Sequence, residues 1–124
     1  MTIRNEAKIE RRIQDKTDEM IERLDLGWLD VTNRFLTHRD GQEGVLCEAK
    51  TNWEYRRVSF HWNTSSAATA LDDEIENAVI HELVHALNAP LYDELSPKMQ
   101  ARLAKNNELA TENVARAILA ALSK

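Results

Sequence analysis

The hydrophobic and polar positions of the chain divide it into a helical first part, a strand-like middle part and a helical last part. Over residues 1–24, apolar side chains recur at near-helical spacing among many charged ones, which predicts one amphipathic helix. Gly27 lies just beyond this segment and is expected to stop the helix, because glycine easily adopts the backbone conformation of a helix C-terminus.

The middle part, from Gly27 to Asn63, consists of short apolar stretches between turn-forming residues. Its last stretch alternates strictly between polar and apolar residues and places Val58, Phe60 and Trp62 on one face. This part of the sequence therefore predicts two or three short antiparallel strands.

Two helices follow, after a linker of small residues at positions 65–66. The first covers about residues 71–88 and is expected to end at Pro90, since proline cannot continue the backbone hydrogen bonds. Ser96 and Pro97 begin the second, as the N-cap and the first helical residue, and its pattern continues to the C-terminus. The order of elements predicts an α+β fold with an N-terminal helix, a small antiparallel sheet of about three strands and two further helices.

Composition indicates a globular chain, because 43% of its 124 residues are hydrophobic and 30% are charged. This length predicts one domain over residues 1–124. The formal net charge of -5 argues against nucleic acid as a partner, because binding phosphates requires a basic face. We expect a cytoplasmic protein without membrane contact, because no signal-like start and no long apolar stretch is present. The single cysteine, Cys47, excludes an intrachain disulfide and a cysteine-rich zinc site.

The most informative segment is His-Glu-x-x-His at residues 81–85, in an apolar, helix-like context. On a helix, residues four apart are neighbours, so the imidazoles of His81 and His85 can bind one Zn²⁺ at about 2.0–2.1 Å. Glu82 then projects beside the metal, where it can take a proton from water and return it to a leaving amine. The alternative is a pair of histidines that only pack in a core, and the helical context favours the metal site.

A catalytic zinc needs a third protein ligand and an open fourth position. The third histidine of the metzincin spacing would fall at Leu91, and a histidine four residues after His85 would fall at Ala89, so neither pattern is present. The last helix instead offers Glu108 and Glu112, four residues apart on one face. One can bind the metal while the other orients a histidine, and we favour Glu108 as the ligand, with Glu112 as the alternative.

The chain resembles gluzincin-type zinc metallopeptidases, and most of all the small metallopeptidases that phages and prophages encode. The resemblance covers nearly the whole chain as an order of segments: Leu-Gly-Trp at 26–28, Glu-Tyr-Arg-Arg-Val-Ser-Phe at 54–60, the segment 76–85 with its His-Glu-x-x-His, and the last helix with its glutamates. Only the His-Glu-x-x-His motif is specific. The resemblance implies a minimal zincin-like fold in which the last helix brings the third metal ligand.

By this resemblance, His81 and His85 would be zinc ligands, Glu82 the general base and Glu108 the third ligand. Glu112 departs from the family pattern, because related gluzincins often have an aspartate or another supporting residue there. The implied function is hydrolysis of peptide bonds in a peptide or protein substrate by water that the metal activates. The sequence leaves the oligomeric state open.

Two other functions remain open. A zincin fold can serve as a zinc-stabilised binding module that acts on a phage or host protein without cleaving it, because 124 residues leave little chain for a deep specificity subsite. A helical interaction protein without metal is the third interpretation.

Five other residues are considered for minor roles. His61 is either an exposed sheet histidine, which we favour, or a residue that lines the cleft, a place that Asn63 could also take. Tyr92 either donates a hydrogen bond to an oxyanion or is an ordinary loop tyrosine. His38 is interpreted as a turn residue, and Cys47 as a buried, inert thiol.

Overall fold

The structure is a computed structural model that describes residues 6–36 and 45–124. Within these ranges it confirms the α+β class, with helices packed on a small three-stranded sheet. In chain order the elements are α1 (Glu6–Arg23), β1 (Asp30–Leu36), β2 (Cys47–Asn52), the short 3₁₀ helix η1 (Trp53–Tyr55), β3 (Arg57–Asn63), α2 (Thr64–Thr69), α3 (Asp72–Tyr92) and α4 (Pro97–Leu122).

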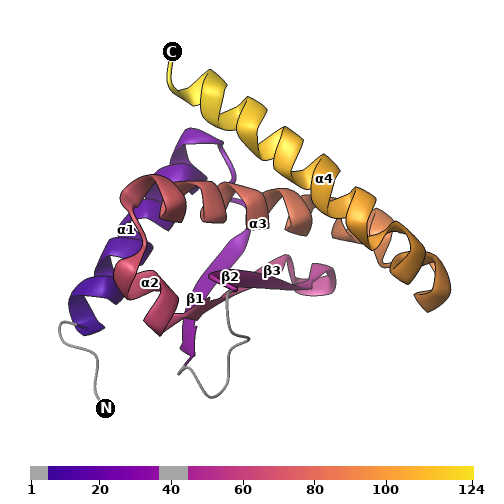
Figure 1. Cartoon of the computed structure of the whole chain (residues 1–124), viewed down its shortest axis with the longest axis horizontal. Helices are drawn as coiled ribbons and strands as arrows, with labels where there is room; N and C mark the ends of the chain where they lie inside the picture. The colour runs from indigo at the N-terminus through magenta and orange to yellow at the C-terminus, as the bar shows by residue number, and fades with distance from the viewer. Residues whose placement is uncertain (1–5, 37–44) are drawn as a thin grey trace.

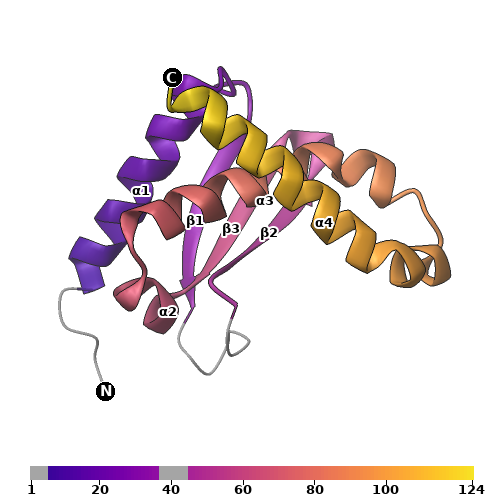
Figure 2. The same cartoon turned by 45° about the horizontal axis from the view of Figure 1, so that its top comes forward.

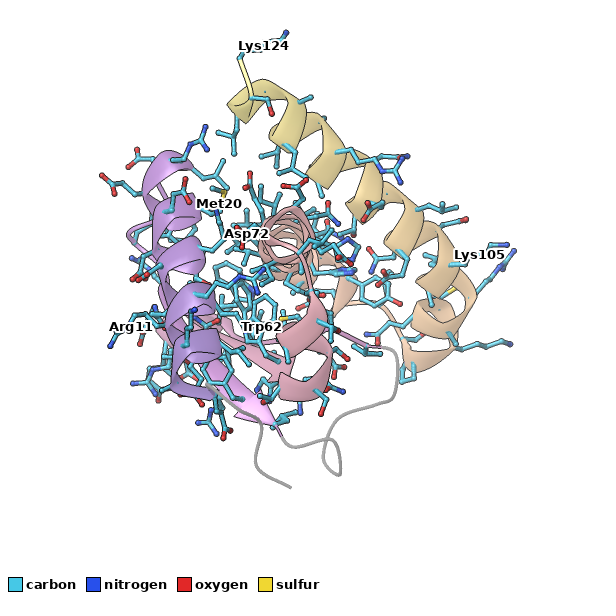
Figure 3. The ribbon with its side chains drawn as sticks, turned by 60° about the vertical axis from the view of Figure 1, so that its left-hand side comes forward. Arg11, Met20, Trp62, Asp72, Lys105 and Lys124 are labelled. Carbon is cyan, nitrogen blue, oxygen red and sulfur yellow. The ribbon has the colours of Figure 1, made fainter. Side chains whose placement is uncertain are left out.

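The elements form layers, with α3 between the sheet and α4 (Figures 1 and 2). α1 and α3 pack on one face of the sheet, and α4 packs mainly on α3. The core lies between α1, α3 and the sheet, where Met20 and Trp62 point into the interior (Figure 3). Its largest fully buried side chains are Trp62, Phe60, Ile13, Met20, Ile75, Ile80 and Leu83.

β3 is the central strand of the sheet, whose order is β1-β3-β2. The strict alternation of its sequence is confirmed in three dimensions, because Val58, Phe60 and Trp62 are all buried. With β3 in the centre, β2 is an edge strand, and it packs against α3.

The predicted all-antiparallel sheet is wrong, because β1 pairs with β3 in parallel and only β2 pairs with it in antiparallel orientation. An alternating sequence pattern shows which side chains share a face of the sheet, but it carries no information about strand direction. η1 joins β2 to β3 closely enough for an antiparallel pair. β1 occupies the other side of β3, with Val31 opposite Val58.

α1 ends at Arg23, four residues before Gly27, so the expected stop at Gly27 is not used. Asp25 adopts the left-handed conformation with φ 55°, and its N–H donates to the carbonyl of Glu22 at 3.1 Å. The N–H of Leu26 donates to the carbonyl of Ile21 at 2.9 Å. These two hydrogen bonds form a Schellman motif, in which Asp25 takes the place that glycine usually holds.

α3 continues past Pro90 to Tyr92, so the predicted end at this proline is wrong. Proline leaves the carbonyl four residues earlier without its helical partner. The indole N–H of Trp53 donates to that carbonyl, the one of Ala86, at 3.1 Å. A side chain from η1 thus replaces the missing hydrogen bond and ties the connection of β2 and β3 to α3.

The remaining helix boundaries follow local signals. The predicted linker at residues 65–66 is instead part of the short helix α2, which begins after an N-cap at Asn63. The start of α4 is confirmed, since the hydroxyl of Ser96 accepts a hydrogen bond from the N–H of Met99 and Pro97 is the first helical residue. In the described part of the chain, none of the helices has the length and apolar character needed to cross a membrane.

Candidate metal centre

The two histidines of the motif lie on the face of α3 that α4 covers. His81 and His85 are one turn apart, their ring centroids are separated by 4.8 Å, and their side chains are only 18% and 20% exposed. α4 crosses this face (Figure 2) and brings Glu108 and Glu112 to it. The pairing of these helices unites residues that are far apart in the sequence.

Glu108 faces both histidines with its two carboxylate oxygens. Oε1 lies 2.7 Å from Nε2 of His85, and Oε2 lies 3.2 Å from Nε2 of His81. His81, His85 and Glu108 each offer one ligand atom, and these three atoms lie within 4.8 Å of one another. Glu108, which the sequence favours as the third ligand, is thus the glutamate that faces both histidines.

Glu112 contacts the opposite side of the first histidine. Its Oε2 lies 2.8 Å from Nδ1 of His81, so this ring nitrogen carries a hydrogen that it donates to the carboxylate. Arg116 donates to Oε1 of Glu112 at 3.2 Å. Desolvation raises the pKa of Glu112, but the hydrogen bonds and charges of His81 and Arg116 together outweigh it and hold this pKa below its ordinary value. Glu112 therefore orients His81, which is the second of the two roles considered for it.

Thr111 orients the second histidine, His85. Its hydroxyl donates to the carbonyl of Asn107 at 2.7 Å, so its oxygen is left to accept from Nδ1–H of His85 at 3.3 Å. Both rings thus have a partner for a protonated Nδ1, and each directs Nε2 toward Glu108. Imidazole donates its lone pair to a metal from the unprotonated nitrogen, so these contacts select the tautomers that a metal requires.

The short contacts of Glu108 require a proton or a cation between the facing atoms. An unprotonated imidazole nitrogen and a carboxylate oxygen both donate electron pairs, so they approach closely only with a proton or a cation between them. Donor atoms on one tetrahedral zinc ion, at about 2.0–2.2 Å each, are ~3.3–3.6 Å apart. The three donor atoms lie within 4.8 Å of one another, and two imidazole nitrogens with one carboxylate oxygen are ligands that zinc accepts, so the residues fit zinc.

Glu82 lies on the side of α3 that faces β2. It is only 9% exposed, and its Oε2 accepts the backbone N–H of Ala49 at 2.9 Å. Burial raises the pKa of Glu82 to about 7, although nearby His81 and the hydrogen bond from Ala49 lower it. A carboxylate with this pKa can both accept and release a proton near neutral pH.

These groups line one cleft of about 760 Å³. β2 forms one wall, α3 the floor, and α4 the other wall at Asn107, Glu108 and Glu112. His61 and Asn63 do not line the cleft, because β3 is central and β2 is the edge strand beside it.

The other candidates are placed as follows. Tyr92 lines the cleft as the last residue of α3. Its hydroxyl donates to the carbonyl of Gln100 at 2.6 Å, and this hydrogen bond fixes the position of the tyrosine ring. His61 is half-buried, and desolvation together with Lys50 and Arg34 lowers its pKa. Cys47 is buried, and burial raises the pKa of its thiol strongly, as expected for an inert residue. The interpretation of His38 lies outside the described residues.

Two contributions were missed from the sequence. Thr111 gave no signal, because a threonine in a helix usually hydrogen-bonds only its own backbone. The N–H of Ala49 is a backbone group and leaves no trace in a sequence, although its partner Glu82 belongs to a recognised motif.

Comparison of the chain with protein-family models, curated proteins and solved structures finds no match in any of the three. The functional argument therefore rests on the motif and on the geometry of the cleft.

Proposed function

We propose that this chain is a zinc-dependent metallopeptidase of the gluzincin type, a minimal zincin that hydrolyses peptide bonds in the cytoplasm. The observation that carries the proposal is the convergence of His81, His85 and Glu108 around one point, with the buried carboxylate of Glu82 on the neighbouring position of α3. Two imidazoles and one carboxylate form a common ligand set of catalytic zinc.

In the proposed reaction, zinc would be held by His81, His85 and Glu108, and when bound it would polarise the peptide carbonyl and lower the pKa of a water molecule. Glu82 in its ionised form accepts a proton from that water, whose oxygen bonds to the carbonyl carbon. Glu82 then delivers the proton to the amide nitrogen as the C–N bond breaks. The products are a carboxylic acid and an amine, and Glu82 returns to its ionised form.

The edge position of β2 supports a peptide as the substrate, although the N–H of Ala49 already donates to Glu82. An edge strand has backbone N–H and C=O groups that no neighbouring strand pairs, and an extended peptide can add to them. β2 lines the cleft from Cys47 to Thr51, beside the histidines. A peptide aligned along it would pass the proposed metal position.

A peptide library digested with zinc-loaded protein tests the proposal, with products mapped by mass spectrometry. We expect the wild-type protein to cleave and Glu82→Gln to bind zinc without cleaving. Glu76→Gln is the matched control, because Glu76 lies on the same helix and pairs with Lys16 outside the cleft; it should cleave like the wild type. Cleavage by Glu82→Gln would refute the role of Glu82.

The same experiment separates the other functions. Bound zinc without cleavage by the wild-type protein would favour the zinc-stabilised binding module. A protein that binds no zinc at all would leave only the metal-free interaction protein.

A further inference from the structure

The outer face of the sheet, which points away from α1 and α3, has a second cavity of about 220 Å³. Alternate side chains of the three strands point to this face and form the floor of the cavity. Ser59 of β3 lies at its centre, opposite Thr32 of β1 on one side and Lys50 of β2 on the other. Arg34 and Arg57 lie one position further along the same face, in opposite directions from this row.

The hydroxyl of Ser59 has no function in the fold. Its Oγ is buried, yet it has no hydrogen-bond partner among the described residues. Val58 and Phe60 point into the core, so the side chain between them points to the outer face. A buried polar atom without a partner costs free energy and is rare in native structures. A ligand in the cavity would supply the partner that the described residues do not.

The charges around Ser59 are mainly positive. Three cationic side chains line the cavity, Arg34, Lys50 and Arg57, beside the single carboxylate of Asp30, although the formal net charge of the chain is -5. Asp30 lies 3.7 Å from Arg57, whereas Arg34 and Lys50 form no salt bridge within residues 6–36 and 45–124. Two cations at this cavity therefore lack a counter-ion from the described residues.

His61, the next residue of β3 on this face, shows the effect of these cations. Desolvation lowers the pKa of His61, the charges of Lys50 and Arg34 lower it further, and Glu48 raises it least. Glu48 lies opposite His61 and does not line the cavity. The positive charges thus dominate on the outer face even beside its second carboxylate.

The donors around the cavity match a phosphate group. Arginine has a planar fork of N–H donors that fits phosphate oxygens, and lysine adds a compact positive charge. The hydroxyls of Ser59 and Thr32 can donate to further oxygens. The cavity is several times larger than the volume of one water molecule, about 30 Å³, so a tetrahedral oxyanion and part of the group that carries it have room.

We propose that the outer face of the sheet binds a phosphate monoester in this cavity, with Ser59, Lys50 and Arg34 as its main contacts. The metal centre lies on the opposite side of the sheet, between α3 and α4. The inference therefore goes beyond the proposed function and does not depend on zinc or on hydrolysis.

An NMR titration of the metal-free protein tests the proposal. Its probes are a short neutral peptide with one phosphoserine, the same peptide with serine, and adenosine 5′-monophosphate, all at equal ionic strength. We expect the phosphorylated probes to shift the amide signals around Ser59 saturably and the serine peptide to leave them unchanged. Tighter binding of the phosphopeptide would identify a phosphorylated side chain as the source of the phosphate, and tighter binding of the nucleotide would identify a nucleotide. Equal shifts with the serine and phosphoserine peptides would overturn the proposal.

A pair of double variants separates this site from net charge. Arg34→Gln/Lys50→Gln should weaken phosphate binding at least about tenfold, because hydrogen bonds to charged groups are lost. Arg102→Gln/Lys105→Gln removes the same charges from α4, outside the cavity, and should bind like the wild type. An equal loss of affinity in both variants would overturn the proposal.

Ser59→Ala separates a ligand contact from a role in the fold. The variant removes a buried polar atom without a partner, so its melting temperature without ligand should equal or exceed that of the wild type. Its affinity for the phosphorylated probe should nevertheless fall about tenfold. Unchanged affinity would refute the contact of Ser59 with the phosphate, and a lower melting temperature would show that the hydroxyl serves the fold instead.

Discussion

Glu82 is the residue on which the proposed chemistry depends, and two opposing effects set its proton affinity. Burial against β2 disfavours the carboxylate and raises its pKa to about 7, while His81 and the N–H of Ala49 favour it. A bound cation would also favour the carboxylate form and lower the pKa of Glu82. Glu82 is thus a base that is poised close to neutral pH without metal and is more easily ionised with it.

This pKa predicts a pH-dependent effect of Glu82→Gln on the metal-free protein. The folded pKa is raised from 4.5 to about 7, so between these values the folded state holds the proton more tightly than the unfolded state. Stability contributed by protonated Glu82 is present below pH 4.5 and is lost as pH rises toward 7. Glu82→Gln should therefore raise the free energy of unfolding by about 1–3 kcal/mol at pH 8.

Urea denaturation in the presence of a chelator measures this effect. At pH 4 the gain from Glu82→Gln should be small, because the wild-type carboxyl is protonated in both states. Glu22→Gln, an exposed change on α1, is the control and should show no such dependence on pH. A gain of equal size at both pH values would contradict the burial of an ionisable Glu82.

Thr111 and Glu112 act through the histidines, which predicts weaker zinc binding when either contact is removed. Thr111→Val keeps the shape of the buried side chain but removes the acceptor for Nδ1–H of His85. Zinc affinity should fall about 10–100-fold, as is typical when a hydrogen-bond partner of a metal ligand is lost. Competition with a chromophoric chelator measures it, and Thr111→Ser should bind nearly as well as the wild type. Unchanged affinity in Thr111→Val would refute this role.

At the scale of the elements, the bond between Trp53 and the carbonyl of Ala86 explains why α3 tolerates Pro90. Trp53→Phe should destabilise the fold by about 1–2 kcal/mol, because it leaves that carbonyl without a donor. In a Pro90→Ala background the new backbone N–H can satisfy the carbonyl, so the same change should have a smaller effect. Chemical denaturation of the four proteins gives the coupling energy. Strict additivity would show that the indole bond does not compensate for the proline.

The end of α1 gives a second prediction at this scale. Asp25 adopts φ 55°, so Asp25→Gly should stabilise the protein by about 0.5 kcal/mol. A Cβ at Gly27 would meet no atom within 4 Å, so Gly27→Ala should be tolerated or mildly stabilising. Destabilisation by Gly27→Ala, in thermal unfolding, would indicate that Gly27 does stop the helix.

The elements also show what the sequence could and could not predict. β3 and the two long helices were predicted well, because alternation and helical spacing record which side chains are buried. The strand direction of β1, the stop at Asp25 and the passage of α3 through Pro90 were not, because each depends on a partner that is distant in the sequence or on backbone geometry. At the site, the spacing of His81 and His85 predicts that pair and the sequence favours Glu108 over Glu112. Only the crossing of α3 and α4 brings Glu108 to both histidines.

At the scale of the whole molecule, α4 is a long helix with few buried anchors. Only Thr111 and Ala115 are buried among its 26 residues, and its main contacts are with α3. A metal held by His81, His85 and Glu108 would link these two helices directly.

This link predicts that zinc protects α4 from hydrogen exchange. Amides of α4 should exchange more slowly in zinc than in a chelator, while those of the β3 core change little. Glu108→Ala should remove the difference. Equal exchange of wild-type α4 with and without zinc would mean that the metal does not connect the helices.

The central claim is that one zinc ion binds between α3 and α4, and anomalous scattering at the zinc edge from crystals grown with zinc tests it most directly. We predict one strong peak per chain, about 2.0–2.2 Å from Nε2 of His81, Nε2 of His85 and a carboxylate oxygen of Glu108, with Glu112 hydrogen-bonded to His81 and outside the coordination sphere. No peak at this position, or a peak coordinated by Glu112 in place of Glu108, would contradict the account.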